Sequence, residues 1–397
     1  MIAGYSNESS HSPMLEPLLR TIARALQDAL QFREDWIRHS RHTGPDFASR
    51  ARRAIEQARL LRTSAMDAED YYRLGLHRTD MSFADKRRFI GKYRSARYYQ
   101  RINPLQYEVF GHDKVLMHLL ALQLGVPMAP VLASTAGPGD PVIGEHLAGL
   151  NALREFLLRP ASQSLFLKPC TGTLGLDTLA LGERLADSRS WRRIPGRGSI
   201  DLEEVVAHCM DANGRMRRFL VQPRLAPHPA LARIVPEVLH TVRVGTLFEG
   251  GRVHVLGAAL RMGAGTRPTD NAMDPGGISI PFDLHTGVLG EGLEVADGVA
   301  RRRPDHPVTH HPFAGSVLPY WREALDTAEA AARGFSFIPW LSWDVGICES
   351  GPVITEFNTR SRWTSVQAAT GKGLLAGKLG EVLSAHAGIG ASGLRHS

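Results

Sequence analysis

The sequence predicts an α+β protein with two or three lobes, in which a helical N-terminal region precedes antiparallel sheets. The chain has 397 residues and is 43% hydrophobic, which is enough for a sizeable core and too much for one simple layered domain. Apolar residues recur at helical spacing over residues 13–65. Farther along, extended apolar segments separated by glycine-containing turns predict antiparallel hairpins.

The N-terminal quarter reads as basic helices. The helical spacing of apolar residues that begins at residue 13 recurs in residues 50–62. Residues 66–101 read as helical fragments rich in tyrosine and arginine. Residues 1–101 hold 19 Lys+Arg and 12 Asp+Glu, a balance of +7, so the rest of the chain is neutral. Such a surface could meet RNA, lipid head groups or an acidic protein. Solvated, amphipathically packed helices explain it as well, and we favour them over a nucleic-acid partner.

The middle of the chain alternates between helices and strands. We expect helices over 113–124, which ends at Gly125-Val126-Pro127, and over 145–159, near 201–210, over 319–333 and from 364 onward. Strands are expected at 164–168, 177–183 and 217–222. Hairpins are expected from 239–249 with 252–262 through Gly250-Gly251, from 277–283 with 286–289, and from 342–348 with 352–358.

The C-terminal hairpin carries the sharpest chemical pattern. Glu356 and Asn358 are two residues apart on a strand and therefore share a face. A three-residue loop, 349–351, would place Asp344 opposite Glu356 on the same face. All three side chains offer hard oxygen ligands, which Mg²⁺ prefers while it leaves positions open for phosphate oxygens. A hairpin with polar residues on its solvent face is the alternative.

A second pattern follows the strand that ends at Lys168. The loop Cys170-Thr171-Gly172-Thr173-Leu174-Gly175 could close its backbone N–H groups over phosphates, and Lys168 would supply charge. The loop lacks the Gly-Lys-Ser/Thr of a Walker A motif, and it leads into a strand, unlike a Rossmann fingerprint. An ordinary hairpin turn is the alternative. A third segment, Gln222-Pro223-Arg224, could present backbone groups to an adenine ring.

Taken in order, these pieces resemble the ATP-grasp superfamily over roughly residues 105–370. A narrower resemblance is to the sugar-transfer-associated ATP-grasp family, which includes proteins similar to α-L-glutamate ligases. The segments that carry it are YYRLGLHRTDMSFADKRRF (71–89), QPRLAPHPAL (222–231), HTVRVGTL (240–247), GAALRMGAGTRPTDN (257–271), DPGGISIPFDLHTG (274–287), HHPFAG (310–315) and LPYWREAL (318–325).

The resemblance implies an ATP-grasp fold, in which two α+β lobes with antiparallel sheets grip ATP. It divides the chain into a helical basic region (1–104), the N-terminal or linker part of the core (105–160), a small lobe (161–225) and a large lobe (226–385). Lys114 and Lys168 would contact ATP phosphates, the loop from Thr171 to Gly175 would cover them, and Gln222 would mark the adenine-side hinge.

The resemblance also implies that Asp344, Glu356 and Asn358 hold Mg²⁺. Arg243, Arg261 and Arg360 become candidates for the γ-phosphate or a substrate carboxylate, which a guanidinium grips in bidentate fashion. Surface salt bridging is the alternative for the first two. Asp270 and Asn271 are further candidates. Better-known ligases carry an arginine shortly before the metal aspartate, whereas this chain has Leu341-Ser342-Trp343 there.

The function implied is an ATP- and Mg²⁺-dependent ligase that joins a small-molecule carboxylate to an amine through an acylphosphate. Alternatives are a phosphotransferase acting on a hydroxyl and a nucleotide-regulated binding module. Three widely spaced cysteines without a CxxC pair favour a reducing cytoplasm over a disulfide framework. The longest apolar runs are too short for a membrane span. A homo-oligomer is left open.

Overall fold

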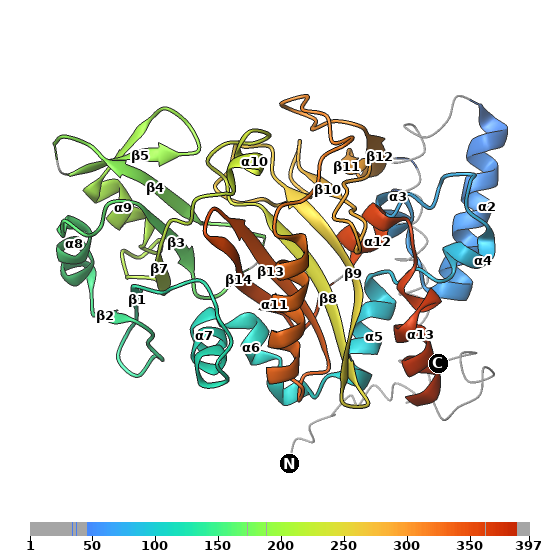
Figure 1. The fold of residues 1–397 in the computed structure, drawn as a ribbon, viewed down its shortest axis with the longest axis horizontal. Coiled ribbons are helices and arrows are strands. Elements are labelled where there is room, and N and C mark those ends of the chain that lie inside the picture. The colour runs from blue at the N-terminus through green and yellow to red at the C-terminus, as the bar shows by residue number, and fades with distance from the viewer. Residues whose placement is uncertain are drawn as a thin grey trace, which may run out of the picture.

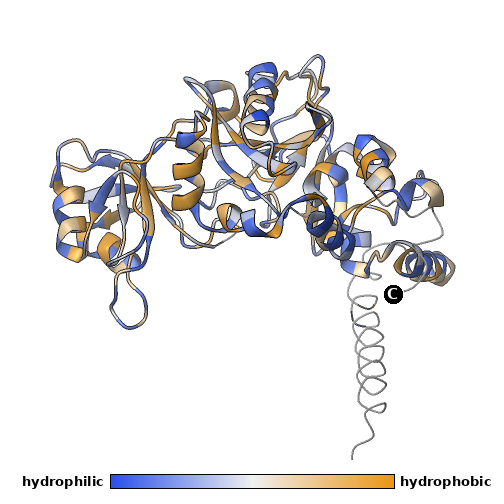
Figure 2. Ribbon diagram, turned by 90° about the horizontal axis from the view of Figure 1, so that it is seen from below, coloured by the Kyte–Doolittle hydropathy of each residue, from blue (hydrophilic) through white to orange (hydrophobic). Residues whose placement is uncertain are grey.

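The computed structural model describes residues 34, 37, 46–172, 174–187, 189–361 and 363–386. The helix expected at the start of the chain therefore lies outside the described residues, as does Thr173. Three parts follow one another along the longest axis of the molecule, namely a first sheet with its helices, a second and larger sheet, and a cluster of helices that includes both early and late segments (Figures 1 and 2).

The helices and strands of the described residues have the following bounds. The helices are α2 (Phe47–Ser64), α3 (Ala68–Arg73), α4 (Phe83–Lys86), α5 (Lys92–Ile102), α6 (Val109–His112), α7 (Lys114–Gln123), α8 (Leu150–Leu158), α9 (Leu202–His208), α10 (Pro229–Ala232), α11 (Trp321–Gly334), α12 (Thr364–Thr370) and α13 (Lys378–His386). The strands are β1 (Ala133–Thr135), β2 (Glu145–Leu147), β3 (Leu165–Pro169), β4 (Leu179–Arg184), β5 (Ser190–Ile194), β6 (Ser199–Asp201), β7 (Phe219–Pro223), β8 (Thr241–Glu249), β9 (Arg252–Met262), β10 (Ile278–Ile280), β11 (Gly292–Ala296), β12 (Val299–Arg303), β13 (Trp340–Cys348) and β14 (Gly351–Asn358).

The N-terminal helices pack onto the rest of the molecule through their tyrosines. Tyr71 and Tyr72 are buried in a cluster that also contains residues of β11 and β12. Tyr99 of α5 stacks on Trp340 of β13, with ring centroids 4.2 Å apart. Tyr98 is buried in the same region, whereas Tyr93 stays half exposed. Burial of four of these rings supports the packing interpretation over a stacking surface for bases.

The first sheet has seven strands in the order β2-β1-β7-β3-β4-β5-β6. All its pairs are antiparallel except β1 with β2. Apolar residues of α8 and α9 pack with the inward side chains of the strands, and Phe156, Val206 and Trp191 are among the buried members of this core. Lys168, near the end of the central strand β3, reaches the second sheet, where its Nζ donates to the carbonyl of Thr355 in β14.

The second sheet also has seven strands, in the order β12-β11-β10-β9-β8-β13-β14, and every pair is antiparallel. Helix α11 packs against β8, β9, β13 and β14. Along β13, Trp343 and Val345 belong to the core shared with α11. Because side chains alternate along a strand, Ser342 and Asp344 face the opposite side of the sheet, toward the candidate site.

Most predicted elements are present, but several boundaries and pairings were wrong. The segment expected as a helix over 145–159 begins with β2, which pairs in parallel with β1, and its helix starts only after Gly149, a residue with φ of +110°. The expected 286–289 strand is reduced to two isolated bridges, Phe282 with Leu289 and Val288 with Val317. Strand β10 pairs instead with β9 and β11.

Three hairpins were missed, namely β4–β5, β5–β6 and β11–β12. Pro195-Gly196 lies between β5 and β6, and a Pro-Gly pair is a turn signal. The pair β11–β12 turns at Asp297-Gly298, where both residues have positive φ of 52° and 77°. An Asp-Gly pair between extended segments is a strong hairpin signal, so these last two hairpins were predictable.

Candidate functional site

A cleft of about 750 Å³ separates the two sheets. Every predicted site residue that the structure describes lines this cleft. They are Lys114, Lys168, Thr171, Gly172, Gly175, Gln222, Arg243, Arg261, Asp344, Glu356, Asn358 and Arg360, together with the further candidates Asp270 and Asn271. Their segments are far apart in the sequence, so the fold alone brings them together.

The charged residues on the second sheet form one row across three strands. Arg243 of β8 pairs in the ladder with Asp344 of β13, which pairs in turn with Glu356 of β14. Asn358 lies two residues farther along β14, opposite Ser342. Residues directly opposite in an antiparallel ladder point to the same face, so these side chains share the cleft face.

The position of Asp344 opposite Glu356 agrees with the prediction, but its cause differs. Cys348 pairs with Gly351, so the loop has two residues and not three. That turn alone would put the two carboxylates on opposite faces. A bulge between Asp344 and Val345 in the ladder leaves Thr355 as the extra residue and restores the common face.

Asp344 is the centre of a buried ion-pair network. Its Oδ1 lies 2.5 Å from Nε of Arg243, and its Oδ2 accepts hydrogen bonds from Arg243 at 3.0 Å and from Arg261 at 3.2 Å. The carboxylate side chain is only 5% exposed. Burial raises the pKa of Asp344, and the two guanidinium groups oppose that shift. Arg243 and Arg261 are therefore buried charge partners, and the surface salt-bridge alternative is wrong for them.

Asp270 extends this network on the side of Arg261. Its Oδ1 lies 3.5 Å from Nη2 of Arg261. Its Oδ2 accepts hydrogen bonds from the backbone N–H and the hydroxyl of Thr241, at 2.7 and 2.5 Å. Asp270 thus fixes the segment that carries it against the edge of the charged row.

Glu356 differs from Asp344 because it makes no hydrogen bond or ion pair within the described part of the chain. Burial opposes its ionisation, but the positive charges of Lys114, Lys168 and the two arginines hold the pKa of Glu356 below its ordinary value. An ionised carboxylate with free oxygens therefore faces the cleft.

Two lysines reach this region from the other side of the cleft. Lys168 is buried, and its Nζ donates to the carbonyl of Thr355 at 3.2 Å. Burial lowers the pKa of Lys168 to about 8, although Glu356 favours its charged form. Nζ of Lys114, at the start of α7, donates to the carbonyl of Gly172 at 3.1 Å. Both ammonium groups lack a carboxylate within ion-pair distance in the described residues.

The loop between β3 and β4 adopts unusual backbone angles. Gly172, Leu174 and Gly175 have φ values of +120°, +62° and +65°. A Cβ atom on Gly175 would lie 2.7 Å from side-chain atoms of Thr269, so only glycine fits this contact with the opposite wall. The loop therefore spans the cleft above the lysines, while Thr173 at its tip lies outside the described residues.

The two remaining predicted residues are placed toward the ends of the cleft. The amide of Gln222 donates to the carbonyls of Ala129 and Pro130, so its side chain ties β7 to the segment that precedes β1. Arg360 is largely exposed and pairs with Glu108, with Nε 2.5 Å from Oε1. Arg360 therefore stands apart from the buried network of Arg243 and Arg261.

The donors at the bottom of the cleft suit a magnesium ion. Glu356 has both oxygens free, and no hydrogen bond is made by the side-chain amide of Asn358 within the described residues, so its oxygen is available as a ligand. Mg²⁺ takes one or two carboxylates and completes its shell with water and phosphate oxygens. Asp344 would contribute as a ligand if Arg243 and Arg261 moved away from its oxygens. No cluster of three His, Cys, Asp or Glu residues exists among the described residues, so asparagine would complete the set.

The sequence analysis did not single out three charged residues that line the cleft, namely Arg73, Glu237 and Asp274. Arg73, at the end of α3, lines the same cavity as the charged row. Arg73 lies in the segment 71–89 that carries the family resemblance, but nothing in that segment marks this arginine as a site residue, because α3 reaches the cleft through tertiary packing, which includes contacts with β12 and α12. Burial raises the pKa of the Cys170 thiol to about 12, which supports its interpretation as a packing residue.

Comparisons with solved structures find ATP-grasp enzymes at low similarity. Biotin carboxylase from Campylobacter jejuni has 14% identity and a TM-score of 0.38, and the match covers 70% of this chain and 46% of that one. The D-alanyl-alanine synthetase A from Vibrio cholerae has 11% identity and a TM-score of 0.37, and the match covers 70% of this chain and 65% of that one. The L-amino acid ligase from Bacillus licheniformis has 12% identity and a TM-score of 0.34, and the match covers 65% of this chain and 42% of that one. The chain thus spans less than two thirds of the length of these three chains.

The comparison with protein families is more specific. No curated protein matches the chain. In the part of the chain that the structure describes, every helix is too short or too polar to cross a membrane. Residues 93–382, which contain the whole charged row, match the family described as sugar-transfer associated ATP-grasp, and the chain therefore belongs to that family.

Proposed function

We propose that this protein is an ATP- and Mg²⁺-dependent carboxylate–amine ligase that forms an amide through an acylphosphate. One observation carries the proposal. Lys168 reaches from β3 to the carbonyl of Thr355, next to Glu356, so that unpaired positive and negative groups from both sheets meet in one cleft. Such a site suits a polyanion that arrives with a divalent cation.

The nucleotide fits this cleft in one orientation. Lys114 and Lys168 bind the phosphates as compact positive charges. The loop from Thr171 to Gly175 covers the phosphates with backbone N–H groups. The adenine lies toward Gln222, whose bond to the 129–130 segment holds that wall of the cleft in place.

Asp344, Glu356 and Asn358 would hold Mg²⁺ at the second sheet. When bound there, the ion supplies charge neutralisation for the phosphate oxygens. Asp344 already has two arginine partners, and we propose that these guanidinium groups pass to the γ-phosphate or the substrate carboxylate when nucleotide and metal arrive. At the cleft edge, Arg360 would release Glu108 and bind the substrate carboxylate instead.

The proposed reaction has two steps. A carboxylate oxygen of the first substrate attacks the γ-phosphorus, the bond to the β,γ-bridging oxygen breaks, and ADP leaves. An amine nitrogen then attacks the acyl carbon, the carbon–oxygen bond to phosphate breaks, and amide, phosphate and one proton are released. The protein contributes by positioning and by stabilising charge. His310 and His311 do not line the cleft, so no base role is assigned to them.

ADP release in the presence of hydroxylamine tests this proposal. The purified protein is incubated with Mg-ATP and a panel of amino acids and other small carboxylates, with and without hydroxylamine, beside Glu356→Gln. A ligase gives carboxylate-stimulated ADP and a hydroxamate, and the variant gives neither. ADP release that responds only to hydroxyl compounds, without hydroxamate, would overturn the ligase in favour of a phosphotransferase.

A further inference from the structure

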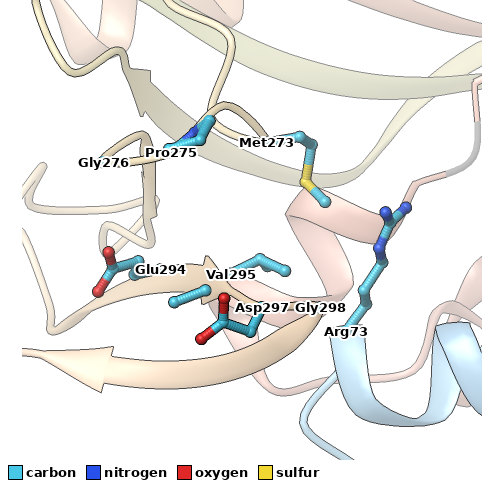
Figure 3. Close-up of a pocket in the computed structure, with 9 residues that line it drawn as sticks. Arg73, Met273, Pro275, Gly276, Glu294, Val295, Asp297 and Gly298 are labelled. Carbon is cyan, nitrogen blue, oxygen red and sulfur yellow. The ribbon is translucent and has the colours of Figure 1, made fainter. Parts of the chain in front are cut away.

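A second, smaller cavity adjoins the cleft behind Met273. Its volume is about 280 Å³. Its walls come from the loop that follows β9, from the β11–β12 hairpin and from the end of α3 (Figure 3). Arg73 and Met273 line both this cavity and the main cleft. The two spaces are therefore neighbours that share these two side chains as their boundary.

Arg73 is only partly used by the protein. Its Nη1 lies 2.8 Å from a carboxylate oxygen of Glu69, one helical turn earlier, and the side chain is 32% exposed. Its Nε is buried without a hydrogen-bond partner. A guanidinium offers five N–H donors, so most N–H groups of Arg73 remain available to a ligand at the boundary of the two cavities.

The opposite wall of the small cavity is acidic. Glu294 of β11 and Asp297 of the adjoining turn both line it (Figure 3). Glu294 lies 3.6 Å from Arg303 on the neighbouring strand, and Asp297, which is largely exposed, lies 4.0 Å from Arg301. A molecule that bridges this space meets a positive group at one end and negative groups at the other.

The loop between the two spaces is firmly held. On the cleft side, Asp270 binds Thr241 and faces Arg261, as described above. Next to it, Asn271 donates to Asp274 at 3.0 Å and accepts from the backbone N–H of Met273 at 3.2 Å. The boundary between the two cavities is therefore fixed by the protein's own contacts, with Arg261 on the cleft side and Arg73 where the two cavities meet.

We propose that the small cavity is a substrate subsite that binds a compact, carboxylate-bearing molecule, with Arg73 as its carboxylate-recognising residue. An amino acid satisfies both ends, because its ammonium group can face Glu294 and Asp297. That the bound molecule is one of the substrates to be ligated rests on the proposed function. Arg73 lies outside residues 93–382, so the N-terminal region would select the substrate for the ATP-grasp core.

Binding of small carboxylates to the intact protein tests the subsite. Isothermal titration with glycine, L-glutamate and succinate is performed in the presence of Mg-ADP, with glycinamide as the probe that lacks a carboxylate. At least one carboxylate binds the wild type, and Arg73→Gln weakens it about tenfold or more, the usual cost of a lost charged hydrogen bond. Glycinamide does not bind.

Two further variants separate recognition from general damage. Arg333→Gln removes a similar arginine–glutamate pair one helical turn apart, on α11 and away from both cavities. This variant should bind the carboxylate ligand like the wild type. Ala296→Leu places a larger side chain in the small cavity and leaves the cleft lining unchanged, so it should weaken binding of the carboxylate ligand. The proposal is overturned if no carboxylate binds the wild type, or if Arg73→Gln or Ala296→Leu binds it unchanged.

Mg-ATP binding to the same variants keeps this result distinct from the proposed function. Ala296→Leu should retain the Mg-ATP affinity of the wild type, since Ala296 lines only the small cavity. A wild type that binds a carboxylate in the subsite without any Mg-ATP affinity would refute the ligase and leave the subsite standing. A wild type that binds Mg-ATP but none of the carboxylates would refute the subsite alone.

Discussion

The free energy of unfolding should fall much more when Asp344 is neutralised than when Glu356 is. Asp344 has two guanidinium groups in contact, at 2.5 to 3.2 Å, whereas Glu356 has no ion-pair partner among the described residues. Asp344→Asn removes the shared partner of two buried charges. Breaking a buried ion pair in this way costs about 3 to 5 kcal/mol.

Glu356→Gln should cost about 1 kcal/mol or less, because it removes no direct contact. It loses only the longer-range attraction of Lys114, Lys168, Arg243 and Arg261, and it relieves the repulsion with Asp344. Urea unfolding without nucleotide or metal measures the difference, with Trp340, Trp343 and Trp363 as buried fluorescent reporters at the second sheet. For urea slopes of about 1 to 3 kcal/mol per M, the midpoint of Asp344→Asn should fall by roughly 1 M or more.

Both variants should nevertheless lose ADP formation, since both residues belong to the proposed metal site. The dissociation between stability and activity is the informative result. Equal destabilisation by the two substitutions would refute the assignment of Asp344 as a structural ion-pair centre and of Glu356 as a carboxylate held free for a ligand.

Three other predictions concern the lysine and the glycines of the site. Burial lowers the pKa of Lys168 to about 8, so this lysine loses its charge as the pH rises from 7 to 9.5. The affinity of the wild type for Mg-ATP, measured by titration, should therefore fall over that range. The affinity of Lys168→Arg should stay constant over the same range, because arginine keeps its charge. Gly175→Ala should raise the KM for ATP, because its Cβ meets the opposite wall, whereas Gly214→Ala has a similar φ of +73° with nothing within 4 Å and should not. Gly245→Ala should lower the thermal midpoint by several degrees, since its Cβ would fall 2.0 Å from the Trp363 ring and overpacking costs about 1 to 3 kcal/mol; an unchanged midpoint would contradict this close packing.

Local sequence signals predicted the elements that depend on local chemistry. The Gly250-Gly251 hairpin forms as expected, because both glycines take positive φ, at 58° and 76°. The helix after Asp113 begins where its carboxylate caps the backbone N–H groups of Val115 and Leu116. These features need only a few neighbouring residues to be determined.

Features that depend on distant segments were not predictable in the same way. The bulge opposite Asp344 leaves no sequence signature, and the prediction of a shared face was right only because the bulge offset the shorter loop. The grip of Arg243 and Arg261 on Asp344 joins three strands, and Arg73 approaches from a helix outside the core. Spacing along the chain cannot reveal such contacts, since tertiary packing determines them.

Magnesium-dependent nucleotide binding tests the central claim most directly. Titration calorimetry compares ATP binding with Mg²⁺ and with EDTA, in the wild type, in Glu356→Gln and in the control Arg333→Gln. The site described here predicts that Mg²⁺ strengthens ATP binding in the wild type and in the control but not in Glu356→Gln. If Glu356→Gln bound Mg-ATP as tightly as the wild type, with the same response to EDTA, the assignment of the metal and nucleotide to this cleft would be contradicted.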